Sequence, residues 1–324
     1  MDEFEAIARL FRPLSEGAPE ALDLSDDAAA IPPRPGFDLV VTKDAVVEGV
    51  HFLASDPPDL VARKLLRVNL SDLAAKGAEP YGYFLAVAWP HDYADEAKAA
   101  FAAGLGEDQA AFGVRLFGGD TVSTPGPLTA SVTMLGWVPT GRMVRRSGAR
   151  PGQVLMVTGS IGDGGLGLMA AQGGLPGLGE AEREALAARY RLPQPRLALR
   201  EALLAHAAAA LDVSDGLVAD AIHMEEASGV ALQIDLERLP LSGPAKAWLA
   251  LQPDTARGLL DLATAGDDYE LVIAADVTVA LPLAMAAAAG GFALTPIGRV
   301  VDGQGTILLH RGEPVLARRT GWRH

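Results

Sequence analysis

The residues of this sequence best suited to chemistry are aspartates that stand beside glycine, serine or threonine at the apparent ends of strands and helices. They lie in six segments: SDDAA (Asp26, Asp27), TKDAVVEGVHF (Asp44), NLSDLAAKGAEP (Asp72), FGGDT (Asp120), DVSDG (Asp212, Asp215) and AGDDYEL (Asp267, Asp268). Aspartate is a favoured N-cap and turn residue, so each one taken alone is better explained by structure. Taken together, carboxylates with small, flexible neighbours suit Mg²⁺, which prefers oxygen ligands and is often held by carboxylates plus substrate phosphates. The set favours a Mg²⁺–nucleotide site.

One of these aspartates has a polar neighbour on the same side of a predicted helix. Apolar residues at three- and four-residue spacing predict a helix over Pro58–Ala78. Asn69 and Asp72 are three residues apart and therefore share a face of it. An ion pair between Asp72 and Lys76 at i, i+4 is an equally good explanation of this spacing.

A histidine and two arginines complete the candidate chemical groups. His51 in EGVHF is either a ligand or a satisfied strand histidine, and the second is the more usual case. Arg145 and Arg146 are either solvated charges of a linker or the cationic donors that phosphate recognition needs.

The glycine-rich segments do not match the common nucleotide-binding motifs. The sequence has no GxxxxGK[ST] phosphate loop. Residues 162–167 read GxGxxG after a strand, but a loop and a helix follow where a dinucleotide fold needs a second strand that ends in an acidic residue. We interpret these glycines as a tight turn whose helix N-terminus can approach an anion.

Composition excludes several classes of protein. The 324 residues include 41 acidic and 27 basic ones, a net charge of −14, which disfavours a nucleic-acid partner. With no cysteine there is no disulfide, thiolate nucleophile or cysteine-ligated metal. The acidic N-terminus does not resemble a signal peptide, and the apolar stretch Leu271–Leu294 is interrupted by Asp276, Pro282 and two glycines. We expect a cytoplasmic protein with no membrane segment and, from its length, about two domains.

Strand-like and helix-like segments alternate along the chain, which predicts a mixed α/β protein. Strands are expected at Asp38–Thr42, Gly82–Trp89, Val114–Gly119, Leu128–Val138, Val154–Thr158, Ala231–Ile234, Tyr269–Ala274, Ile297–Val301 and Thr306–His310. Further helices are expected at Ala94–Phe112, Gly165–Gln172 and Glu180–Tyr190, and alanine-rich ones around Ala202–Ala210 and Ala284–Ala289.

Two connections between these elements are predicted. The polar stretch Pro139–Gly152, rich in glycine and arginine, is the best candidate for a linker between domains. The last two strands, which are separated by Asp302-Gly303-Gln304-Gly305, are expected to form a hairpin with a four-residue loop.

In this order, the motifs resemble the thiamine-monophosphate kinase family, which belongs to the superfamily of aminoimidazole-ribonucleotide synthetase and selenophosphate synthetase. The resemblance extends from SDDAA through TKDAVVEGVHF, NLSDLAAKGA, FGGDT, RRSGARPG, VTGSIGDGGLGL, LDVSDGL and AGDDYEL to the terminal GWRH. It therefore covers nearly the whole chain. The ordered set is specific, although no single element would suffice.

The resemblance implies a two-domain α/β (α+β) fold like that of aminoimidazole-ribonucleotide synthetase. Residues 1–140 would form an N-terminal domain with a mixed sheet and helices, which binds ATP and Mg²⁺ and pairs with its copy in a homodimer. Residues 150–324 would form a C-terminal α/β domain. The implied reaction moves the γ-phosphate of ATP onto thiamine monophosphate to give thiamine diphosphate.

The resemblance also implies roles for individual residues. Metal ligands would be Asp26, Thr42, Lys43 through its backbone, Asp44, Asp72, Asp120, Asp212 and Asp215. ATP would contact Gly119, Asp120, Arg146 and Ser214, and thiamine monophosphate would contact His51, Asp267 and Trp322. Catalysis would depend on Asp44, Asp72, Asp120 and Arg146.

Three positions depart from the usual motifs of the family. Ser25 replaces the first glycine of a Gly-Asp-Asp motif, and Asp267 stands where glutamate is common, so its side chain is one methylene shorter. Lys43 stands where a small hydroxyl residue is frequent, so that only its carbonyl can serve a metal.

Other functions are compatible with acidic Mg²⁺ loops. An aminoimidazole-ribonucleotide synthetase would use them to activate an amide oxygen, but VEGVHF, AGDDYEL and the terminal Trp322 favour the thiamine enzyme. Selenophosphate synthetase is disfavoured by the lack of cysteine. A metal-dependent phosphohydrolase would release phosphate without an acceptor, and a noncatalytic module would bind ATP without forming a product.

Overall fold

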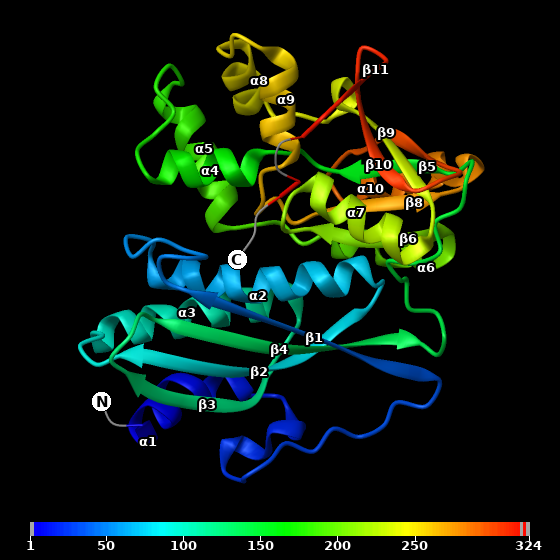
Figure 1. Cartoon of the computed structure of the whole chain (residues 1–324). Coiled ribbons are helices and arrows are strands. Elements are labelled where there is room, and N and C mark those ends of the chain that lie inside the picture. The colour runs from blue at the N-terminus through cyan, green and yellow to red at the C-terminus, as the bar shows by residue number, and fades with distance from the viewer. Residues whose placement is uncertain (1–2, 318–319, 322–324) are drawn as a thin grey trace. The chain divides into compact units, whose positions relative to one another are not determined.

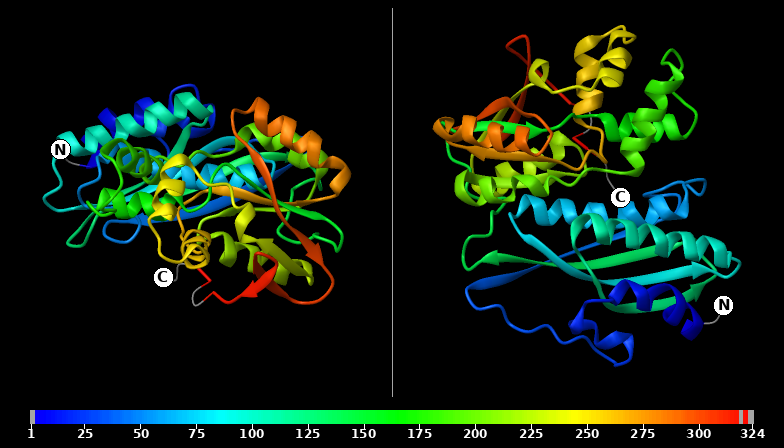
Figure 2. Two further views of the ribbon diagram at one scale, coloured as in Figure 1. Left: turned by 90° about the horizontal axis from the view of Figure 1, so that it is seen from above. Right: turned by 180° about the vertical axis from the view of Figure 1, so that it is seen from behind.

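The computed structural model describes residues 3–317 and 320–321 of the chain. Its contacts group into two compact units: Met1–Leu73 with Ala78–Arg142, and Ala74–Gly77 with Met143–His324. Each unit contains a β-sheet with helices beside it (Figures 1 and 2). The matched strands and helices confirm the predicted mixed α/β class.

The sheet of the first unit has the strand order β1-β4-β2-β3 within the described residues. Its strands are β1 (Phe37–Val47), β2 (Glu79–Pro90), β3 (Leu116–Thr124) and β4 (Thr129–Pro139). β4 is antiparallel to β1 and β2, whereas β2 and β3 are parallel, so the sheet is mixed. β1 is longer than predicted, because the two-residue alternation continues through TKDAVV.

Two long helices, α2 (Pro58–Ala75) and α3 (Asp95–Phe112), cover one face of this sheet (Figure 1). Their apolar stripes are fully buried, as are the strand residues that point toward them. The fully buried large side chains include Leu65, Leu66, Leu70, Leu73, Tyr83, Phe101, Leu105 and Met134. The apolar residues that recur at helical spacing in the sequence therefore form the core of this unit.

The opposite face of the sheet is partly covered by the N-terminal segment (Figures 1 and 2). This segment folds into short helical turns: α1 (Glu3–Ala6), η1 (Ile7–Phe11), η2 (Arg12–Ser15) and η3 (Pro19–Leu24). Ala18 and Ala21 pack there against Phe117 and Leu135. The part of this face that carries Leu39, Val41 and Val122 stays exposed.

A buried ion pair ties α2 to α3. Arg67 binds Asp108 with two hydrogen bonds, from Nε to Oδ2 at 2.6 Å and from Nη2 to Oδ1 at 3.0 Å. The Arg67 side chain is 6% exposed and that of Asp108 is fully buried. A bidentate contact of this kind fixes the relative position of two helices as well as satisfying both charges.

The sheet of the second unit has the order β11-β10-β7-β9-β5-β8-β6 within the described residues. Its strands are β5 (Val154–Thr158), β6 (Ala207–Val213), β7 (Ala231–Asp235), β8 (Glu270–Ala275), β9 (Leu294–Val301), β10 (Gly305–His310) and β11 (Glu313–Val315). The helical elements are α4 (Asp163–Ala171), α5 (Glu180–Arg191), η4 (Leu197–Leu199), α6 (Arg200–His206), α7 (Leu217–Ser228), η5 (Leu236–Arg238), α8 (Gly243–Ala250), α9 (Thr255–Ala263), η6 (Val277–Val279) and α10 (Ala280–Ala289).

The central strands of this sheet are buried on both faces. In β5, Leu155 and Val157 belong to one apolar cluster and Met156 to another. β8 divides in the same way, with Val272 in the first cluster and Ile273 in the second. Burial on both faces explains why these strands are continuous apolar runs in the sequence instead of alternating ones.

Two predictions for the second unit are wrong. The alanine-rich stretch at 202–210 is only helical as far as His206, after which Ala207–Val213 form β6 against β8. The high helix propensity of alanine is overridden by pairing with an apolar strand. The expected hairpin is also absent from the described residues, because β7 lies between β9 and β10 and pairs with both.

Residues 3–317 and 320–321 contain no helix with the length and apolar character of a bilayer span.

Gly104 of α3 approaches the backbone of α2 so closely that a side chain cannot fit. A Cβ at this position would lie 2.2 Å from the Asp59 carbonyl oxygen. Gly104→Ala should therefore destabilise the protein by about 1–3 kcal/mol, measured by denaturant unfolding. Gly106→Ala in the same helix is the matched control, because its Cβ would meet Leu14 at an ordinary 3.5 Å. It should stabilise by up to about 1 kcal/mol through helix propensity. Equal effects of the two changes would contradict this packing argument.

Candidate functional site

A group of oxygen donors lies between β1 and α2 of the first unit. The Thr42 hydroxyl donates a short hydrogen bond to the Asp72 carboxylate. Beside them, the backbone N–H of Asp44 donates to Asn69 Oδ1 at 3.1 Å, and Asn69 Nδ2 donates to the Leu65 carbonyl at 2.9 Å. Asn69 is fully buried, so it links the strand firmly to the helix. The structure thus brings Thr42, Asp44 and Asp72 together.

The two carboxylates of this group repel each other. Burial, followed by the nearby charge of Asp72, raises the pKa of Asp44 from an ordinary 3.8 to about 6. Two facing carboxylates and a hydroxyl form an all-oxygen donor set of the kind that hard divalent cations prefer. A cation bound there would remove the repulsion, so these residues fit Mg²⁺.

Lys43 and His51 have different roles in the same region. The Lys43 side chain lies on the exposed face of β1, where Nζ donates to Ser131 Oγ at 2.7 Å. In His51, Nδ1 accepts the backbone N–H of Val47 at 3.1 Å, which closes the turn after β1. That bond leaves Nε2 as the donor atom of the neutral ring. Lys76 donates to the carbonyl of Ala210 at 3.0 Å.

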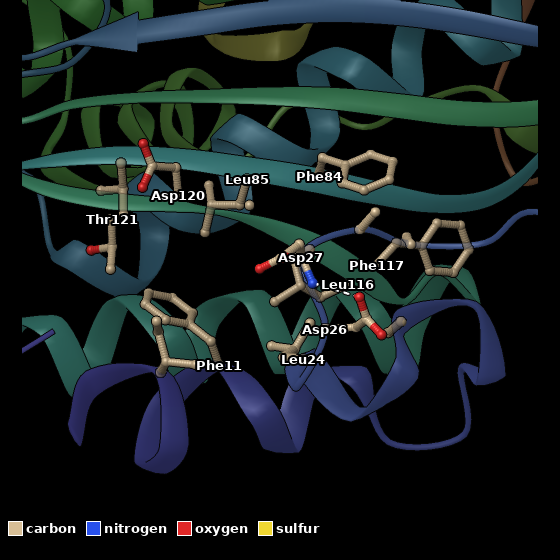
Figure 3. Close-up of a pocket in the computed structure, with 17 residues that line it drawn as sticks. Phe11, Leu24, Asp26, Asp27, Phe84, Leu85, Leu116, Phe117, Asp120 and Thr121 are labelled. Atoms are coloured by element: carbon tan, nitrogen blue, oxygen red, sulfur yellow. Dashed lines mark hydrogen bonds between the residues drawn. The ribbon is translucent and has the colours of Figure 1, made fainter. Parts of the chain in front are cut away.

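A second acidic group borders a cavity of about 380 Å³ beside β3 (Figure 3). Asp26, Asp27, Gly119 and Asp120 line it together with apolar side chains that include Phe11, Leu24, Phe84, Leu116 and Phe117. Gly119 is required by close packing, since a Cβ there would lie 1.8 Å from the Leu85 carbonyl oxygen. The cavity combines an acidic rim with apolar walls.

These two acidic groups occupy different places in the unit. The strand order puts three inter-strand spacings between β1 and β3, about 14 Å. Asp44 aligns across the sheet with Gly119, and Asp120 with Ala86, so that Asp44 and Asp120 point to opposite faces. Ligands of one Mg²⁺ lie about 2.1 Å from it, so one ion cannot bind both carboxylates within a single chain.

In the second unit, the predicted site residues meet where β6 ends and β8 begins. The Asp267 N–H donates to the Ser214 carbonyl at 2.8 Å, and the Tyr269 N–H donates to the Val213 carbonyl at 2.7 Å. Asp212 lies inside β6 and is 7% exposed, whereas Asp215 is half-buried in the loop that follows. Trp322 lies outside the described residues.

Sequence analysis missed two residues of this region, Asp220 and His223. Their ligand atoms and that of Asp215 all lie within 4.8 Å of one another. Asp220 Oδ2 accepts the backbone N–H groups of Ser214 and Asp215 at 3.0 and 3.1 Å. The spacing D-x₄-D-x₂-H, with the last two residues one helical turn apart in α7, is the signal that could have found them.

Asp220, at the start of α7, also has a raised pKa. Burial, followed by the charge of Asp215, raises its pKa to about 7. The two backbone amides and the Arg146 guanidinium act in the opposite direction. Arg146 is exposed but lies near enough to influence Asp220, so it shares this region with Ser214 and Asp215.

The chain matches two sequence families in succession. Residues 25–138 match the AIR synthase related protein, N-terminal domain, and residues 150–311 match the AIR synthase related protein, C-terminal domain. The mixed sheet of the first unit and the aspartates of both units lie within these ranges. The chain is therefore an AIR synthase related protein.

Individual relatives are more specific. The chain is 55% identical over 322 residues to the thiamine-monophosphate kinase of Caulobacter vibrioides, which covers 99% of this chain and 90% of that relative. Its fold is similar to the crystal structure of thiamine-monophosphate kinase from Stenotrophomonas maltophilia, with a TM-score of 0.84 and 36% identity over 97% of this chain and 98% of that one. AaThiL, which was solved in complex with AMPPCP and TMP, has a TM-score of 0.79 and 30% identity over 92% and 91%. This chain belongs to the thiamine-monophosphate kinase family.

The raised pKa of Asp44, caused by burial and then by the charge of Asp72, predicts a dependence of stability on pH. Because its folded-state pKa lies above 3.8, its neutral form favours folding, and this contribution is lost as the pH rises through about 6. In metal-free buffer at pH 8, Asp44→Asn should therefore raise the free energy of unfolding by about 3 kcal/mol, and by much less at pH 4. Urea unfolding at both pH values measures this difference. Asp92→Asn, at an exposed position, is the control and should show no such gain. A pH-independent effect of Asp44→Asn would refute the assignment.

Proposed function

We propose that this chain transfers the γ-phosphate of ATP to thiamine monophosphate and forms thiamine diphosphate and ADP. The observation that supports this most directly is the oxygen-donor group of Thr42, Asp44 and Asp72 in a member of the thiamine-monophosphate kinase family. The complex of AaThiL with AMPPCP and TMP supports the same pair of substrates. Since ATP is the phosphate donor, we expect the enzyme to work in the cytoplasm.

We propose Mg²⁺ as the metal and several ions as its number. Candidate ligands are Asp26, Thr42, the Lys43 carbonyl, Asp44, Asp72, Asp120, Asp212 and Asp215. The opposite directions of Asp44 and Asp120 support at least two positions in the first unit. The half-buried Asp215 supports another in the second. When bound, Mg²⁺ would neutralise negative charge on the phosphate groups.

For the two substrates, we propose separate sets of contact residues. Gly119, Asp120, Arg146 and Ser214 would contact ATP, and the apolar walls of the cavity beside β3 suit its base. The acceptor would contact His51, Asp267 and Trp322. The Nε2 atom of His51 is suited to donate to a phosphate oxygen, since Nδ1 already accepts a backbone N–H.

The mechanism requires positioning and charge compensation and no general base. The acceptor is a phosphate monoester that is already anionic, so no hydroxyl proton has to be removed. The main obstacle is repulsion between two anions, about 4 kcal/mol for unit charges 4 Å apart at an effective dielectric constant of 20. Asp44, Asp72 and Asp120 would hold the cations that offset it, and Arg146 would stabilise the charge of the transferring group.

The test is phosphorus NMR of the protein with Mg²⁺, ATP and thiamine monophosphate, beside a sample without the acceptor. Thiamine diphosphate and ADP should form together, and only in the complete mixture. Phosphate release without the acceptor would instead indicate a phosphohydrolase. Absence of any product would favour another ATP-dependent synthetase of the superfamily or a noncatalytic module.

Asp72→Asn should lower kcat at least about 100-fold. Even the loss of a residue that only hydrogen-bonds to a metal ligand lowers metal affinity or activity about 10–100-fold. The fold should persist, since asparagine keeps the size and can still accept the Thr42 hydroxyl. The control is again Asp92→Asn, which should turn over normally. Turnover by Asp72→Asn within threefold of wild type would remove this aspartate from the mechanism.

We further propose that the chain forms a homodimer through the uncovered face of the first sheet. Leu39, Val41 and Val122 share this face and are 41%, 55% and 50% exposed. Exposed apolar side chains on an open sheet face are typical of an interaction surface. Light scattering should give the mass of two chains for the wild type and of one chain for Val41→Glu. A monomeric wild type at micromolar concentration would refute the dimer.

A further inference from the structure

The loop that carries Asp267 has an unusual backbone. Asp267 and Tyr269 have φ values of +68° and +50°, the left-handed conformation that side chains other than glycine rarely adopt. They stand directly before and after Asp268. Strained residues of this kind persist only where the surroundings fix them, and they cluster at functional sites.

Asp268 provides the first of these constraints. Its carboxylate is fully buried and accepts the backbone N–H of Gly162 through Oδ2 at 2.7 Å and that of Gly164 through Oδ1 at 2.9 Å. These amides are at the N-terminus of α4, whose own N-cap residue, Gly162, makes no side-chain cap. The anion at this helix N-terminus is therefore a side chain of the protein itself.

Close backbone packing provides the second constraint. A Cβ on Gly164 would lie 2.3 Å from the carbonyl carbon of Asp267. On the other side of the loop, a Cβ on Gly266 would lie 2.7 Å from the Ser214 carbonyl oxygen. The GxGxxG segment thus allows α4 to lie directly against the Asp267 loop.

A partly buried arginine provides the third constraint. Arg189 of α5 donates through Nη2 to the Asp268 carbonyl at 2.8 Å and to Glu270 Oε1 at 2.5 Å. Glu270 is fully buried and also binds Arg196 and Thr158. Both the side chain and the backbone of Asp268 are consequently held by other elements.

From these contacts we propose that Asp268 is a positioning residue for the acceptor. Asp268 holds Asp267 in its left-handed conformation. Asp267 in turn donates its backbone N–H to the Ser214 carbonyl, which fixes its position beside the loop proposed to contact ATP. The inference rests on the proposed roles of Asp267 and Ser214. A purely structural role would affect the stability of α4 but not the recognition of the acceptor.

Asp268→Asn tests the inference, because asparagine has the same size but offers one acceptor oxygen to two N–H groups. The KM for thiamine monophosphate should rise about tenfold or more, while kcat changes less than about threefold. Hydrogen exchange of peptides covering residues 264–270 should accelerate about tenfold in the free enzyme, since the Asp267 and Tyr269 amides lose their fixed partners.

Ser242→Ala is the matched control. Ser242 donates to Asp163 at the start of α4 and caps α8, but the described contacts do not link its side chain to the Asp267 loop. It should lower the melting temperature without changing KM or the exchange of residues 264–270. Gly164→Ala is a second test that leaves Asp268 intact, and it should reproduce the rise in KM by displacing Asp267 directly.

Two failures can be told apart. If wild-type enzyme forms no thiamine diphosphate, the proposed function fails, whatever the exchange data show. The positioning role is refuted by a different result with active wild-type enzyme. In that case Asp268→Asn and Gly164→Ala both have a KM for thiamine monophosphate within twofold of wild type, and their residues 264–270 exchange hydrogen at the same rate as in Ser242→Ala. Rescue of KM is not expected from Asp268→Glu, because the longer side chain does not fit a fully buried site.

Discussion

Two pairs of neighbouring aspartates in this protein are held close together although their carboxylates repel each other. A chain with a net charge of −14 nevertheless places Asp44 beside Asp72 in a partly buried position, and Asp215 beside Asp220. Neither arrangement is favourable for the protein without bound cations. In each pair, burial and the neighbouring charge raise the pKa of one carboxyl group, that of Asp44 or that of Asp220. Bound cations would offset this electrostatic cost at the places proposed to bind metal and phosphate.

Hydrogen bonds between side chains and the backbone hold these charges in place. Asn69 bonds both the backbone of β1 at Asp44 and its own helix, so the strand and α2 cannot separate to relieve the repulsion. Asp220 performs the corresponding role for the loop at Ser214 and Asp215. The alternation of side chains along a strand then separates the acids by face, with Asp44 toward the helices and Asp120 on the other side.

The aspartates of the six acidic segments therefore have different structural roles. Asp72 lies in a group of oxygen donors, whereas Asp268 serves as the cap of a helix that begins more than 100 residues earlier in the chain. For Asp268 the common structural role of aspartate, N-capping, is the correct explanation. Neighbouring carboxylates in one motif thus divide into a positioning residue and a proposed substrate contact.

The sequence alone was sufficient to predict the mixed α/β class, most strands and helices and the family, because these depend on local periodicity and on the order of motifs. Strand β6 and the partners of β9 and β10 could not be predicted. The helix propensity of alanine and the length of a loop are local properties, whereas the pairing of strands depends on segments distant in the chain. The same limit applied to the acids. Asp44 and Asp120 were expected just beyond the ends of strands but lie within β1 and β3. Which carboxylates face one another, and which instead bind backbone amides, was decided only when the tertiary structure brought those elements together.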